Sequence, residues 1–178
     1  MTDINSTNAD ATSEAESTWA NLSRYAPLAW LIVVAALAGL AISIGFGQAT
    51  MTTFMHGFMG VFLIIFALLK LFDLQGFRAG FAKYDLAARH IPTYGLIYPF
   101  IELALGHAYL AFWMPPVTYL ATLVVFTFGT FGVVSALRRG LNINCPCMGN
   151  ILSVPLSTVT LTEDLAMVTM ALMLLYQI

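Results

Sequence analysis

Charged residues are scarce in this sequence of 178 residues. Asp, Glu, Lys and Arg together make up only 9% of it, whereas hydrophobic residues make up 60%. An ordinary soluble domain carries about 25% charged residues. A chain with so few polar side chains cannot cover a water-exposed surface, so the composition predicts an integral membrane protein embedded in a lipid bilayer. The formal net charge of −2 argues against nucleic acid as a partner, because nucleic-acid binding needs a basic face.

Cysteine is also scarce, since Cys145 and Cys147 are the only two in the chain. Two cysteines cannot build a disulfide scaffold. They lie in the short polar stretch NINCPCMGN, residues 142–150, separated only by Pro146. If the pair has a function, it is redox chemistry or soft-metal binding.

The chain divides into two parts by composition. Residues 1–25 are polar, acidic and rich in Ser, Thr, Asn and Ala, which predicts a disordered tail. The tail lacks the positive charge that opens a secretory signal, and its apolar run starts too late for one. Residues 26–178 are predicted to form one transmembrane domain.

Apolar runs of about 20 residues predict membrane-spanning helices. Very short turns around residues 48–50 and 114–116 make the first and second spans, and the third and fourth, antiparallel neighbours. The prediction is an all-α integral membrane protein of about five transmembrane helices built on a four-helix bundle. The five spans are 27–47, 51–72, 94–113, 117–137 and 155–177.

The positions of Lys and Arg predict the orientation, because basic residues favour the cytoplasmic side. The two short turns contain no Lys or Arg. The prediction is a multi-pass protein of a bacterial inner membrane, with the N-terminus and the Cys-Pro-Cys loop in the cytoplasm and the C-terminus outside. The basic residues lie before the first span, between the second and third, and between the fourth and fifth: Arg24; Arg78, Lys83 and Arg89; Arg138 and Arg139.

The segment 76–90 between the second and third spans has helical spacing. Phe77, Phe81, Tyr84 and Ala88 recur on one face. This pattern predicts a short interfacial amphipathic helix on the inner membrane surface. An ordinary polar connector is the alternative.

The Cys-Pro-Cys loop has three interpretations. Asn and Gly149 favour a turn, while Pro146 restricts its own φ and biases Cys145 toward extended geometry. A disulfide between residues i and i+2 needs a bent backbone, and strained, exposed disulfides are the labile ones. A redox dithiol fits these features. A soft-metal site for Cu(I) or a similar ion would need a third donor such as Met148, and incidental loop cysteines are the third interpretation.

Ionisable side chains within the spans cost several kcal/mol and usually face a partner or a cavity. Glu102 and Glu163 both lie ~12 Å from the predicted inner boundary. Lys70 either extends to the membrane surface or turns inward toward Asp73 or another acid. We expect a polar cluster of Lys70, Asp73, Glu102, Glu163 and Asp164 beneath the Cys-Pro-Cys loop. The alternative pairs Thr160 with Glu163 in a capping box at the start of the last helix.

His56 and His107 fall at similar depth in the outer halves of their spans. Each is interpreted first as a hydrogen-bonded packing residue. A functional pair that contacts a quinone or a metal ion is the alternative. The glycines at 57, 60, 129 and 132 are expected to be packing notches between helices.

Several stretches resemble the MauE family, which is named for methylamine utilisation and is related to the DoxX-like membrane proteins. The resemblance covers roughly residues 51–170. It is most specific in the K-L-F-D-L run with the following Y-D-L, the Y-P-F-I-E-L helix and the C-P-C-M-G loop. The family's loop typically has a small residue where this chain has Pro146. The resemblance implies a redox-associated membrane protein, and for MauE itself a link to processing or export of the methylamine dehydrogenase small subunit.

The expected function is thiol–disulfide exchange at Cys145 and Cys147 with a thioredoxin- or glutaredoxin-like partner, in support of the maturation or export of another protein. The first alternative is a soft-metal carrier or transporter that binds its ion at Cys145, Cys147 and Met148. The second is a structural subunit of a larger membrane complex. The sequence leaves open the substrate, the direction of electron flow, the oligomeric state and any quinone or metal cofactor.

Overall fold

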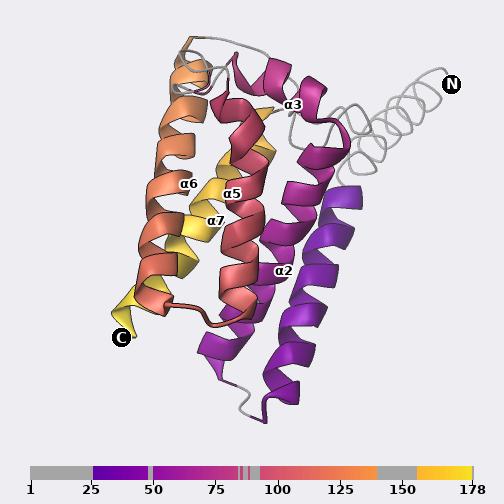
Figure 1. Cartoon of the computed structure of the whole chain (residues 1–178), viewed down its shortest axis with the longest axis vertical. Coiled ribbons are helices and arrows are strands. Elements are labelled where there is room, and N and C mark those ends of the chain that lie inside the picture. The colour runs from indigo at the N-terminus through magenta and orange to yellow at the C-terminus, as the bar shows by residue number, and fades with distance from the viewer. Residues whose placement is uncertain are drawn as a thin grey trace, which may run out of the picture.

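A computed structural model describes residues 26–47, 50–83, 85, 88, 93–139 and 156–177. Every regular element in these ranges is a helix, which confirms the all-α prediction for the described part of the chain. Figure 1 shows the long helices side by side, with a short helix, α3, across one end. The helices are Ala26–Gly45, α2 (Met51–Phe72), α3 (Leu74–Phe81), α5 (Tyr94–Leu110), α6 (Pro115–Arg138) and α7 (Leu156–Tyr176).

Three of these helices are long and apolar enough to cross a membrane: Ala26–Gly45, Met51–Phe72 and Pro115–Arg138. α5 has 17 residues and α7 carries two acids in its first half. At 1.5 Å per residue, α5 is only about 25 Å long. The multi-pass character follows from the three helices, whereas the count of five spans and the four-helix bundle stay predictions.

The turn between α5 and α6 ends the third predicted span earlier than expected, at Leu110 rather than Trp113. Phe112 and Met114 both have positive φ, at 50° and 37°, a backbone conformation incompatible with a continuing helix. Pro115 then begins α6, where its missing N–H is not needed. The turn is therefore as short as predicted, and α5 and α6 are consecutive helices that reverse direction.

α3 is shorter than the predicted amphipathic helix over 76–90 and begins two residues earlier. It starts after Asp73, whose side chain accepts a hydrogen bond from the Gly76 backbone N–H at 2.9 Å. Phe77 and Phe81 are buried, so the expected apolar face exists over this length. Tyr84 and Arg89 lie outside the described residues. Where α3 lies relative to a membrane surface stays a prediction.

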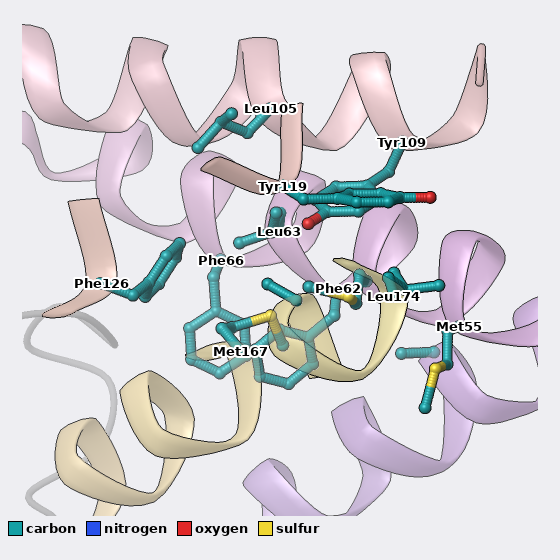
Figure 2. Packing of buried hydrophobic residues seen from close by; sticks show 13 residues of the cluster. Met55, Phe62, Leu63, Phe66, Leu105, Tyr109, Tyr119, Phe126, Met167 and Leu174 are labelled. Atoms are coloured by element: carbon teal, nitrogen blue, oxygen red, sulfur yellow. The ribbon is translucent and has the colours of Figure 1, made fainter. Parts of the chain in front are cut away.

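Four of the long helices pack as two closely packed pairs, α2 with α5 and α6 with α7. Figure 2 shows the apolar core in which these four helices meet. Phe62, Leu63 and Phe66 of α2 contribute to it, and so do Tyr119 and Phe126 of α6. The contacts between the two pairs are fewer than the contacts within each pair.

Glycine lets α2 approach both of its neighbours at backbone distance. A Cβ atom on Gly57 would lie 2.8 Å from the Cα of Gly39 in the first helix. A Cβ atom on Gly106 of α5 would lie 2.9 Å from the carbonyl oxygen of Gly60 and 3.1 Å from the backbone nitrogen of Ile64. Small residues of this kind let helices in membranes pack closely, so the predicted notches at 57 and 60 lie at helix contacts.

We predict that Gly106→Ala destabilises the protein by about 1–3 kcal/mol, because the added methyl group would overpack a contact formed by backbone atoms. Gly45→Ala is the matched control, since a Cβ atom there meets nothing within 4 Å. The measurement is thermal unfolding of both purified variants in the same detergent. Equal unfolding temperatures for the two variants would show that the contact between α2 and α5 accommodates a methyl group without loss of stability.

Candidate functional site

Four ionisable side chains from three helices meet inside the protein. Lys70 near the end of α2 forms a hydrogen-bonded ion pair with Glu102 of α5, and its Nζ lies 4.0 Å from Oε1 of Glu163 in α7. Asp164, the next residue of α7, is also buried. The exposed fractions of Lys70, Glu102, Glu163 and Asp164 are 3%, 0%, 6% and 2%. We call these four residues the acid–lysine cluster.

Aromatic rings hold the Lys70 side chain inside the protein. Its Nζ lies 5.2 Å from the ring centroid of Tyr98, 5.8 Å from that of Phe77 and 5.9 Å from that of Phe66. Tyr98 also forms a side-chain hydrogen bond with Glu102. The negative ring faces attract the ammonium group at this distance. Lys70 therefore turns inward, and the expected alternative in which it extends to the membrane surface is not adopted.

Three carboxylate oxygens in the cluster have no hydrogen-bond partner among the described residues. They are Oε2 of Glu102, Oε1 of Glu163 and Oδ2 of Asp164. Lys70, Glu163 and Asp164 line a small cavity of about 10 Å³. Such a volume holds about one water molecule. Since buried polar atoms are normally hydrogen-bonded, these oxygens mark the cluster as a site with unused bonding capacity.

Gly129 of α6 makes room for this concentration of acids. A Cβ atom at Gly129 would lie 3.2 Å from Oδ2 of Asp164, so a larger residue would press on the carboxylate. The cluster contains three acids and one base, and a charge removed from water is costly unless a partner compensates it. The single ammonium group can compensate one carboxylate, so the other two carboxyl groups depend on protons or water for compensation.

One predicted member of the site, Asp73, has another role, and the alternative role considered for Glu163 is not found. Asp73 does not join the cluster, because its carboxylate is used as the N-cap of α3. The alternative interpretation, a capping box of Thr160 with Glu163, is not adopted. α7 begins at Leu156, which places Thr160 inside the helix rather than at its N-cap. Glu163 is therefore free of a capping role and faces the cluster.

His56 and His107 have different surroundings. His56 is buried, and its Nδ1 lies 2.9 Å from the Tyr109 carbonyl oxygen. A carbonyl can only accept, so Nδ1 carries the proton and Nε2 accepts from the Tyr119 hydroxyl at 2.5 Å. His107 is exposed, and its Nδ1 lies 2.7 Å from the Leu103 carbonyl oxygen on its own helix. These two hydrogen bonds connect α2 to both ends of the α5–α6 turn, and a functional role for His56 and His107 stays a hypothesis.

Cys145, Pro146, Cys147, Met148 and Gly149 lie outside the described residues. In the sequence they belong to the connection between Arg138, the last residue of α6, and Leu156, the first of α7. Val133 and Thr160 line the cavity of the cluster. They are only about 6–8 Å along the helix axes from these two helix ends. The cluster therefore lies close to the points from which the cysteine-bearing connection starts and ends.

Sequence reasoning missed two features of the site. Tyr98 precedes Glu102 by four residues on α5, so the helical spacing alone could have placed it on the same face. Gly129 was expected only as a packing notch, and its contact with Asp164 had no signal in the sequence because Asp164 comes from another helix. No group of three or more His, Cys, Asp or Glu residues in the described ranges has an arrangement that could hold a metal ion.

The architecture and the site define a class, an all-helical multi-pass membrane protein with a buried acid–lysine cluster near one end of its helices. Within this class the chain belongs to the MauE family, since the family model described as methylamine utilisation protein MauE matches residues 48–177. The match includes all four cluster residues and both cysteines. Comparison with curated proteins and with solved structures found no match.

We predict strong coupling between Lys70 and Glu102. Lys70→Met or Glu102→Leu alone leaves a buried charge without its partner and should cost about 3–5 kcal/mol, whereas the double variant should cost much less than the sum. Lys83→Met, at an exposed lysine, is the control and should change stability by less than about 0.5 kcal/mol. The measurement is the free energy of unfolding in detergent. Additive losses in the double variant would contradict an energetically important pair.

Proposed function

We propose that this protein is a membrane thiol–disulfide exchange protein in which Cys145 and Cys147 are the reactive pair. The observation that carries the proposal is the position of the pair in the chain. The only two cysteines lie in the connection between α6 and α7, and the acid–lysine cluster is buried beside the ends of these helices. Membership of a family tied to methylamine utilisation supports a role in the maturation or export of another protein.

The exchange transfers two electrons between two cysteine pairs. The thiolate of Cys147 attacks one sulfur of a disulfide in a thioredoxin- or glutaredoxin-like partner, and the partner's other sulfur leaves as a thiolate. Cys145, as its thiolate, then attacks the Cys147 sulfur of the mixed disulfide. The partner leaves with both of its cysteines reduced, and Cys145 and Cys147 are joined. The reverse sequence of steps reduces this pair and oxidises the partner.

The acid–lysine cluster is suited to proton exchange during this reaction. Conversion of a dithiol to a disulfide releases two protons along with its two electrons. The cluster has two more acids than bases, so its four side chains are neutral together only when two protons are bound to them. Because a buried net charge is costly, proton binding at the cluster and the electrostatic environment of the nearby thiols are expected to influence each other.

The proposal includes the topology expected from the sequence. The chain has five spans, with α2, α5, α6 and α7 forming a four-helix bundle and the helix Ala26–Gly45 packed beside α2. The N-terminus and the Cys-Pro-Cys loop are in the cytoplasm of a bacterium, and the C-terminus is outside. In this orientation the cysteine pair meets the reducing thiol pool of the cytoplasm.

We predict that Cys145→Ser accumulates a mixed disulfide between Cys147 and its partner, because no second thiol remains to release it. Cys147→Ser should accumulate none, and both variants should be inactive in maturation of the dependent protein. The measurement is a non-reducing gel of each variant after rapid acid quenching, with the double Cys→Ser variant as the control. An alternative soft-metal site predicts no adduct in either variant and an equal loss of bound metal in both, and that result would replace the redox proposal.

We also predict that a membrane-impermeant thiol reagent labels Cys145 and Cys147 in inverted vesicles but not in intact cells. The Lys and Arg residues that flank the predicted spans are the reason for this expectation. The double Cys→Ser variant gives the background in both preparations. Labelling in intact cells would place the pair outside, where it meets an oxidising rather than a reducing environment, without affecting the assignment of the reactive residues.

A further inference from the structure

A second cavity lies between the helix Ala26–Gly45, α2 and α7. It is an apolar groove of about 160 Å³. Its walls combine aliphatic side chains of the first helix and of α7 with two phenyl rings of α2: Leu28, Ile32, Ala166, Met167, Phe58 and Phe62. Because Ile32 is 41% exposed, the rim of the groove faces the apolar surroundings of the helices rather than the core. We call this cavity the lateral groove.

Phe58 and Phe62 belong to a row of rings along α2. Phe54, Phe58, Phe62 and Phe66 recur every four residues and therefore share one face of the helix. Consecutive rings are stacked, with centroids 5.7 Å apart for Phe58 and Phe62 and 4.3 Å apart for Phe62 and Phe66. This row gives the lateral groove an aromatic side, and a flat ring gains more from contact with such a side than a flexible chain does.

Glu163 is the charged residue of the lateral groove, and it also lines the small cavity of the acid–lysine cluster. Its side chain is 94% or more buried, and its Oε1 has no hydrogen-bond partner among the described residues. Nζ of Lys70 lies 4.0 Å from that atom and is hydrogen-bonded to Glu102 instead. Because Glu163 lines the lateral groove, a molecule bound there can bring a hydrogen-bond donor to this carboxyl group.

We propose that the lateral groove binds a membrane-soluble molecule with an aromatic ring and a ring hydroxyl group, the chemistry shared by phenols and quinols. The ring would pack against Phe58 and Phe62, and its hydroxyl group would donate to Glu163. An acyl chain would fill the apolar volume but leave the carboxylate without a donor, and a water-soluble ligand would meet mostly hydrocarbon. This inference does not rest on the proposed thiol chemistry, since it involves neither cysteine.

The test uses the full chain in lipid nanodiscs and a matched pair of probes, 4-decylphenol and its methyl ether, which lacks only the donor. Binding is measured by titration calorimetry and corrected with empty nanodiscs for partition into lipid. The wild-type protein should bind the phenol about tenfold more tightly than the ether, the ratio expected for a hydrogen bond to a charged group. In Glu163→Leu this ratio should fall to about one.

Two further variants separate the groove from the rest of the surface. Phe58→Leu should weaken binding of both probes several-fold, because it removes a ring from the aromatic side. Phe131→Leu, at a ring of α6 that is 64% exposed, is the matched control and should leave both affinities unchanged. The proposal is overturned if the wild type binds phenol and ether alike, if the tenfold ratio survives in Glu163→Leu, or if Phe58→Leu and Phe131→Leu behave alike. These results do not depend on whether the cysteine pair is active.

Discussion

The buried contact of Lys70 with Glu102 is the interaction around which the rest of the site is arranged. A lysine at that depth is tolerated only with a carboxylate in direct contact, so α2 and α5 must hold a fixed axial register. Gly60 and Gly106 make that register possible by letting the two backbones touch. Once the ammonium group is fixed there, the acids of α7 lie within reach of the same positive charge, and α3 closes the site with Phe77.

The acid–lysine cluster and the lateral groove share one residue. Glu163 contributes to both cavities, while Asp164 beside it contributes only to the first. Two successive residues of a helix point about 100° apart. Two adjacent acids can therefore face two different cavities. This arrangement connects the interior of the helices with their lipid-facing side through a single carboxylate, next to the helix ends from which the cysteine-bearing connection extends.

Much of this arrangement was predictable because hydropathy and depth are properties of single helices. The start and end of α2 were predicted without error, and the similar depth of Glu102 and Glu163 was sufficient to expect them together with Lys70. Asp73 was misassigned because its role depends on where α3 begins, which a polar and apolar pattern defines poorly. The partners of His56 and the lateral groove were not predictable, since both depend on how separate helices pack, and hydropathy carries no information about that packing.

Because the four helices pack as two pairs, the acid–lysine cluster forms an electrostatic link between the pairs. Lys70 and Glu102 belong to the α2–α5 pair, whereas Glu163 and Asp164 belong to the α6–α7 pair. The attraction between the ammonium group and the α7 acids therefore acts between the two pairs, in addition to the shared apolar core and the hydrogen bonds of Tyr119 with His56 and of Tyr109 with Thr122. Any change of charge at the cluster therefore alters the attraction that acts between the two halves of the protein.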